Sequence, residues 1–158
     1  MLPSTRFRSK AVRSLPMVLA ALLFAGCGTR VPDQSAAYMQ GQSTANAAFY
    51  LQQMQQSTDD SKTNWQLLAI HALLQEGKTP QAIQLFQLLP QNLTDAQRAE
   101  QSLLAVELKL IQQDNASAKS LLASIQPASL NPSQLQRYWQ AQIALNKGAL
   151  SIELLRAL

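Results

Sequence analysis

Residues 64–90 read NWQLLAIHALLQEGKTPQAIQLFQLLP, and they decide the fold because two apolar helical patterns are separated here by a stop and a start. Gly77 suits the left-handed residue that ends a helix. Thr79 then caps a second helix, with Pro80 at its first position, where the missing N–H costs nothing, and Pro90 ends this helix. The stretch therefore predicts a pair of helices joined by a tight turn. The inward-facing residues are Trp65, Leu68, Ala69, Ala72 and Leu73 in the first helix and Ile83, Phe86 and Leu89 in the second.

Helix signals continue on both sides of this pair. The first helix of the pair starts after Asp60 or Ser61, and the chain has few aromatic residues and only five glycines, which favours helix over sheet. The other signals are a helix over residues 43–56, a capping box of Thr94 with Gln97, a break at Asp114 and Asn115, a stop at Pro127, a start at Asn131 and Pro132, and a break at Lys147 and Gly148.

The short helices repeat along the chain. Leu85-Phe86, Leu121-Leu122 and Leu154-Leu155 are equivalent pairs at offsets of 36 and 33 residues. Long and short helices alternating at this period resemble a tetratricopeptide (TPR) solenoid. We therefore expect an all-α, TPR-like solenoid of antiparallel helix pairs over residues 43–158, and an ordinary helical bundle is the alternative. Because the last helix still carries apolar residues at Leu158, we expect a longer protein, with a short natural paralogue as the alternative.

The first 26 residues have the pattern of a secretion signal. A basic segment without acids precedes the apolar run LPMVLAALLFA, residues 15–25, which would span roughly 16 Å as a helix and is too short to cross a bilayer. A buried helix of the domain is the alternative. Four of the thirteen basic residues precede Cys27, so the remaining nine balance nine acids. The net charge of +4 therefore does not predict nucleic-acid binding.

The signal ends in a sequence that resembles the lipobox of bacterial lipoproteins. Residues 23–27 read LFAGC, with small residues before the cysteine, although Phe24 departs from the usual Leu. The resemblance implies an S-diacylglycerol thioether on Cys27, cleavage before it and N-palmitoylation of its amino group. Gly28, rather than Asp, favours the outer membrane over the inner one in enteric bacteria. An incidental cysteine is the alternative, and residues 27–42 are expected to be a lipidated tether.

No active site is evident in the sequence. His71 is the only histidine and lies within a helical pattern, and the acids Asp59 and Asp60 suit a helix start, so we predict no catalytic residue, metal or cofactor. Trp65 and Trp139 fall on apolar helix faces, which indicates core packing. The alternative is that they line a groove that binds a partner.

Six stretches carry a resemblance to a known family: LPMVLAAL (15–22), AGCGT (25–29), AFYLQQMQQS (48–57), NWQLLAI (64–70), RYWQA (137–141) and LLRAL (154–158). In them the chain is similar to a family of outer-membrane lipoproteins that activate a class A penicillin-binding protein in enteric bacteria. The resemblance implies a non-enzymatic regulator of peptidoglycan synthesis, facing the periplasm, of which this chain supplies the lipid anchor and a helical spacer while a C-terminal domain contacts the synthase. A general periplasmic TPR-like scaffold is the alternative.

Overall fold

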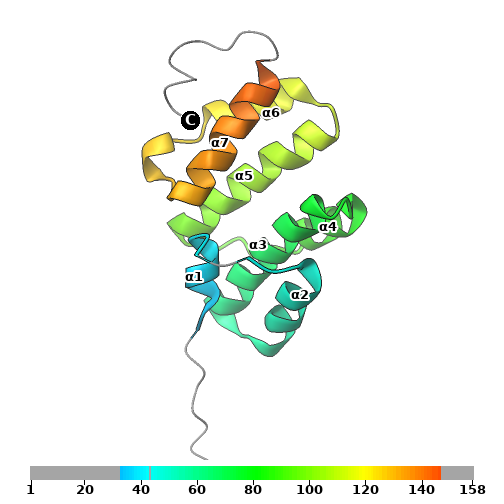
Figure 1. Cartoon of the computed structure of the whole chain (residues 1–158), viewed down its shortest axis with the longest axis vertical. Helices are drawn as coiled ribbons and strands as arrows, with labels where there is room; N and C mark the ends of the chain where they lie inside the picture. Colours follow the sequence, from blue (N-terminus) through cyan, green and yellow to red (C-terminus); the bar gives the residue numbers. More distant parts are fainter. Residues whose placement is uncertain (1–32, 43, 147–158) are drawn as a thin grey trace, which may run out of the picture. The chain divides into compact units, whose positions relative to one another are not determined.

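The computed structural model describes residues 33–42 and 44–146, and every regular element in them is helical (Figure 1). The expected all-α class is confirmed for this part. The expected signal peptide, Cys27 and the last helix lie outside the described residues. None of the described helices is long and apolar enough to cross a membrane. The elements are α1 (Ser35–Met39), α2 (Ala47–Gln56), α3 (Asp59–Gln75), α4 (Thr79–Gln87), α5 (Asp95–Ile111), α6 (Asn115–Ala123), the 3₁₀ turn η1 (Pro127–Ser129) and α7 (Pro132–Leu145).

The end of α3 has the geometry that the sequence predicts, but the predicted cap of α4 is wrong. Lys78 is the N-cap and makes no side-chain capping bond, and Thr79 and Pro80 are the first two residues of the helix. Gly77 is left-handed, with a φ of 71°. Its N–H donates to the Leu74 carbonyl at 3.1 Å, and the N–H of Lys78 donates to the Leu73 carbonyl at 2.8 Å. This pair of bonds is a Schellman motif, which satisfies two carbonyls that the end of a helix leaves free. It reverses the chain within a few residues, so that α4 packs back on α3.

The same motif recurs at intervals of 36 residues. Gln113 is left-handed after α5, with a φ of 60°, and the N–H of Asp114 donates to the Lys109 carbonyl at 2.9 Å. Gly41 has a φ of 73° after α1, 36 residues before Gly77. The predicted alternation of long and short helices is thus confirmed for α3–α4 and α5–α6. The turn, but not the alternation, extends to α1–α2, because α1 has five residues and α2 has ten.

The start signals agree with the structure to within a few residues. The predicted capping box of Thr94 and Gln97 is present at α5, and a second box joins Asn131 and Gln134 at α7. The first expected helix begins later than predicted, at residue 47, because the side chain of Asn46 accepts the N–H of Phe49 and so forms the cap.

The helix α5 is shared by two hydrophobic clusters. Leu104 and Leu108 pack with α2, α3 and α4, whereas Leu103 and Val106 pack with α6 and α7. Neighbouring positions on one helix therefore face two different repeats. This continuity is how a solenoid buries a core that no single pair could bury alone.

The expected tether over residues 27–42 is wrong in its last part, because α1 is folded onto the domain. Ser35 is completely buried and accepts a hydrogen bond from Nδ2 of Asn64 at 3.0 Å. Tyr38 packs against aromatic rings of α2 and α3. The Met39 carbonyl accepts a bond from Nδ2 of Asn131 at 3.1 Å, although these residues are 92 positions apart. The helix α1 therefore joins the first repeat to the start of α7.

The two left-handed turns predict opposite effects of glycine exchange. Gly77→Ala should lower the free energy of unfolding by about 1 kcal/mol, because its Cβ meets no atom and only the left-handed strain remains. Gln113→Gly should raise the free energy of unfolding by roughly 0.5–1 kcal/mol, since it relieves the same strain. Urea unfolding of both variants measures these changes, and destabilisation by Gln113→Gly would contradict this account of the repeat.

Candidate functional site

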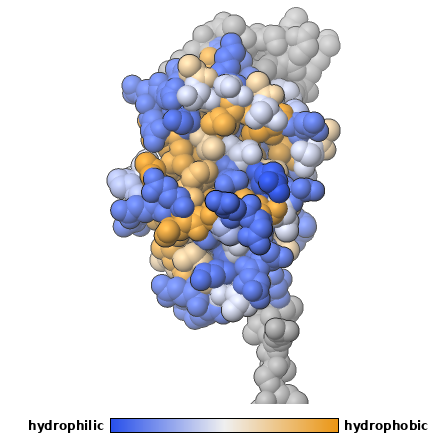
Figure 2. All heavy atoms as spheres, turned by 180° about the vertical axis from the view of Figure 1, so that it is seen from behind, coloured by the Kyte–Doolittle hydropathy of each residue, from blue (hydrophilic) through white to orange (hydrophobic). Residues whose placement is uncertain are grey.

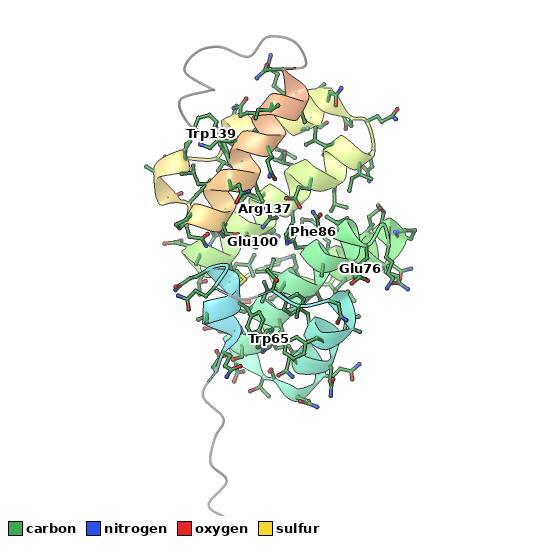
Figure 3. The ribbon with its side chains drawn as sticks, in the orientation of Figure 1. Trp65, Glu76, Phe86, Glu100, Arg137 and Trp139 are labelled. Carbon is green, nitrogen blue, oxygen red and sulfur yellow. The ribbon has the colours of Figure 1, made fainter. Side chains whose placement is uncertain are left out.

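Of the two interpretations of Trp65, core packing agrees with the structure and the alternative of a partner groove does not, because this side chain lies in the core. Only 4% of it is exposed. Its ring centroid lies 5.2 Å from that of Tyr38, 6.1 Å from that of Phe49 and 6.0 Å from that of Tyr50 (Figure 3). The four rings close the space between α1, α2 and α3. Trp65 therefore packs in the core, as its place on an apolar helix face indicates.

Trp139 is half-buried on α7. Its ring meets that of Tyr138 edge to face, with centroids 5.1 Å apart, and it packs against the cluster of α5, α6 and α7. Figure 3 shows Trp139 and Trp65 at separate places in the helical part, so the two do not form one site.

The face opposite that of Figure 1 carries interrupted apolar patches among polar side chains (Figure 2). Of the large apolar side chains in the described part, Leu88 is 74% exposed and Ile111 is 47% exposed. A shallow hollow of about 220 Å³ lies between α5 and the segment after α6. Among its lining residues, the hydroxyls of Ser102, Ser124 and Ser129 donate to backbone carbonyls of their own segments, so no activated nucleophile is present there.

The main polar feature of the domain is a buried ionic cluster between α5 and α7. Nε of Arg137 donates to Oε1 of Glu107 at 2.7 Å, and Nη1 of Arg137 donates to Oε1 of Glu100. Nε2 of Gln134 donates to the second oxygen of Glu100 at 3.0 Å. Figure 3 shows Arg137 and Glu100 turned toward each other from their two helices. Burial lowers the pKa of Arg137, but the charges of Glu100 and Glu107 raise the pKa by more than burial lowers it. The guanidinium therefore stays charged.

This cluster belongs to a repeated series of polar contacts between long helices. The capping glutamine of α5, Gln97, donates from its Nε2 to the side-chain oxygen of Asn64 on α3 at 3.0 Å. The capping glutamine of α7, Gln134, makes the equivalent contact with Glu100 on α5. Both glutamines are almost completely buried. Both α5 and α7 are therefore tied to the long helix before them by the glutamine of their own capping box.

Sequence reasoning did not find Glu100, Glu107 or Arg137. The available signal is the spacing: residues 64, 100 and 137 occupy matching positions on α3, α5 and α7. In the cluster, Oε2 of Glu107 and Nη2 of Arg137 are buried side-chain atoms without a hydrogen-bond partner. No group of three or more metal-ligating side chains occurs among the described residues. The arrangement fixes how the helices stack, and it has none of the paired nucleophile and base that covalent chemistry needs.

His71 lies on α3 beside this cluster. Its Nε2 is 3.4 Å from Nε2 of Gln75. Burial lowers the pKa of His71, and the positive charge of Arg137 lowers it further, while Glu107 and Glu100 act in the opposite direction. The ring is therefore held neutral at a pH where an exposed histidine begins to take up a proton.

Comparisons with known proteins agree on one family. The family described as LppC putative lipoprotein matches residues 40–157. The whole chain is 65% identical to the penicillin-binding protein activator LpoA of Escherichia coli strain K12, and also 65% identical to the LpoA of Klebsiella pneumoniae subsp. pneumoniae. The chain spans only 23% and 22% of the lengths of these two relatives.

Two solved structures match the fold. The amino-terminal domain of E. coli LpoA aligns with a TM-score of 0.73 at 63% identity, covering 80% of this chain and 56% of that domain. The N-terminal domain of LpoA from Haemophilus influenzae aligns with a TM-score of 0.65 at 25% identity, covering 73% of this chain and 51% of that domain.

Removal of the Arg137 side chain should strongly lower the stability of the folded domain. Arg137→Met should lower the free energy of unfolding by roughly 3–5 kcal/mol, because Glu100 stays buried without its counter-ion. Adding Glu100→Gln should restore part of this loss, since the buried charge disappears while Gln134 keeps an acceptor. Urea unfolding of both variants measures the difference. A loss below about 1 kcal/mol for Arg137→Met alone would show that the cluster is screened like a surface pair.

The lowered pKa of His71 predicts a pH dependence of stability. Above the ordinary histidine pKa of about 6.5 the ring binds no proton in either state, so the contribution of His71 to stability is constant. As the pH falls through that value, the unfolded chain takes up the proton first, and stability declines until the folded ring is also protonated. Thermal unfolding between pH 7.5 and 5 should show this decline in the natural chain and a smaller one in His71→Gln. An equal decline in both would assign it to other groups.

Proposed function

The chain belongs to the LppC lipoprotein family, and on that premise we propose that it is the membrane-anchored N-terminal part of an activator of a class A penicillin-binding protein. The observation that carries this proposal is the 65% identity over the whole chain to proteins named as penicillin-binding protein activators. The activity of those relatives belongs to much longer chains. We therefore assign to this chain only two roles that its own residues can perform, attachment to the membrane and spacing.

The first of these parts is attachment. Cys27 follows a basic segment, an apolar run and the small residues Ala25 and Gly26, which suit a lipoprotein signal, and the family is one of lipoproteins. Acyl chains on Cys27 anchor the protein, and Gly28 directs it to the outer membrane, where the folded part faces the periplasm. Each buried CH₂ contributes about 0.8 kcal/mol, so several chains hold the protein durably.

The second part is spacing. The repeats are joined by a common helix, α5, and by buried polar contacts from each long helix to the next. These features favour a stiff support rather than a catalyst, and we assign no catalytic residue and no cofactor. The support holds downstream segments of the longer protein at a set distance from the membrane, where they contact the synthase.

A reconstituted assay tests whether this chain is a spacer and activation requires the rest of the longer protein. A purified class A penicillin-binding protein is mixed with residues 28–158 or with mature LpoA from E. coli, and both binding and the rate of glycan polymerisation and cross-linking are measured. We expect binding and stimulation by the longer protein only. Stimulation of equal size by residues 28–158 would show that the helical repeats themselves activate the enzyme, and would overturn the assignment of a spacer.

Two substitutions at neighbouring positions test the lipid anchor and the choice between the inner and the outer membrane. Cys27→Ala should abolish incorporation of labelled palmitate and release the protein from membranes. Gly28→Asp should leave palmitate incorporation unchanged but move the protein from the outer to the inner membrane fraction of an enteric host. Membrane fractionation after labelling distinguishes the two results, and membrane retention of Cys27→Ala would contradict lipid anchoring.

A further inference from the structure

We propose that helix α1 is a detachable strap that sets the reach of the membrane tether: docked on α3 and α7 it holds the domain close to the bilayer, and released it lengthens the tether. This inference rests on the proposed lipid anchor at Cys27. It is a different claim from anchoring itself, because it concerns what lies between the anchor and the first repeat.

The strap is held by contacts at both of its ends. At the N-terminal end, Asn64 on α3 donates to the buried Ser35 hydroxyl at 3.0 Å, while Asp33 accepts the N–H of Ser35 at 2.9 Å within the strap itself. At the C-terminal end, Asn131 at the start of α7 donates to the Met39 carbonyl at 3.1 Å. Between these ends α1 crosses from one long helix toward another, so its docked position depends on two different repeats.

The fit at the C-terminal end is close. Gly41 follows α1 with a φ of 73°, and a Cβ at this position would lie 2.7 Å from Cβ of Ser133 on α7. Glycine is therefore needed both for the left-handed turn and for contact with α7. By contrast, Gly77 at the equivalent turn has no atom within 4 Å of such a Cβ. The constraint on Gly41 thus comes from docking the strap as well as from the repeat.

The strap has little stability of its own. The helix α1 has five residues, far fewer than an isolated helix needs in water. It is helical because it is docked, and Tyr38 is its only aromatic contact with the core. The core clusters of α3, α5 and α7 contain larger numbers of buried residues. Elements of this kind open locally at a smaller free-energy cost than the whole domain.

Release of α1 changes the reach of the tether by a large factor. Five residues, 28–32, separate Cys27 from Asp33, so even a fully extended chain reaches no more than about 20 Å from the anchor to the docked strap. Release adds residues 33–46, up to the start of α2, and about 45–50 Å of further extended length. Movement of the domain beyond the first limit therefore requires that α1 undocks.

One substitution separates docking of the strap from the stability of α7. Asn131 uses Nδ2 to hold α1, and its side-chain oxygen accepts the N–H of Gln134 as the cap of α7. Asn131→Asp keeps the capping oxygen and removes the donor to Met39. Thr94→Asp is the matched control, because it also places Asp at the cap of a long helix, on α5, where the side chain of Thr94 bonds the N–H of Gln97 and not α1.

The first test is the accessibility of buried thiols in the full chain carrying Cys27→Ala, so that the result does not depend on acylation. Ser35→Cys reports α1 and Ala118→Cys reports the core of α6; both positions are completely buried. We expect the thiol at position 35 to react with a maleimide at least 100-fold faster than that at position 118. Asn131→Asp should accelerate the first reaction at least tenfold more, and Thr94→Asp should not. Equal rates with equal urea dependence would overturn the proposal, because α1 would then open only with the whole domain.

Hydrogen exchange of the chain without introduced thiols checks that Ser35→Cys does not itself release the strap. Amides of residues 37–42 should exchange before those of residues 65–74. Exchange of both segments together would overturn the proposal even if the thiol at position 35 were reactive.

The second test measures reach on the membrane. The acylated protein, labelled on α6, is bound to vesicles containing an acceptor lipid, and energy transfer is compared between the natural sequence, Asn131→Asp and Thr94→Asp. We expect lower transfer for Asn131→Asp alone. Equal transfer in all three would overturn the strap. Absence of vesicle binding in all three would instead refute the proposed anchor, in which case the strap fails as a tether device while the thiol result still reports its opening.

Discussion

The left-handed residue that follows α1, α3 and α5 is the constraint on which the rest of the structure depends. It turns the chain back through a Schellman motif at Gly41, Gly77 and Gln113, so the interval of 36 residues between them becomes the interval of the repeat. Glycine takes this conformation without strain, but Gln113 does not, and it holds the same geometry all the same. The packing of α6 on α5 and α7 therefore offsets the backbone strain at Gln113, which a glycine at this position would not have.

Given these turns, the stacking of successive helices is specified by buried polar groups rather than by apolar contacts alone. Apolar side chains tolerate small shifts along a helix, whereas a bond such as that of Gln134 with Glu100 fixes one alignment. Arg137 adds a charged partner on the same helix, and the resulting cluster carries two carboxylates for one guanidinium. Burial of such a group is costly, so its role is better understood as setting the alignment of α5 and α7 than as adding stability.

The sequence predicted the helices whose start and stop signals are local and whose apolar period is long enough to detect. The capping box at Thr94 and the stop at Gly77 are of this kind. It did not predict α1, because five residues contain little more than one helical turn and the helix exists only through contacts with α3 and α7. The cluster around Arg137 was missed for a related reason: its members are charged residues 30 and 37 positions apart, which resemble ordinary surface positions until the helices are stacked. Trp65 could be placed on an apolar face, but only the packing of α1 and α2 decides that this face is covered.

A solenoid in which each repeat touches only its neighbours bends most easily at the junctions between repeats. The bond between Met39 and Asn131 joins positions 92 residues apart and so departs from that nearest-neighbour pattern. A contact that spans several repeats resists bending for as long as it is intact. It lies in the element with the least stability of its own, and that element is also the first to receive any pull from the N-terminal side. Stiffness and reach are therefore coupled in this chain: the contact that restrains the stack of long helices is the one that must break before the tether can lengthen.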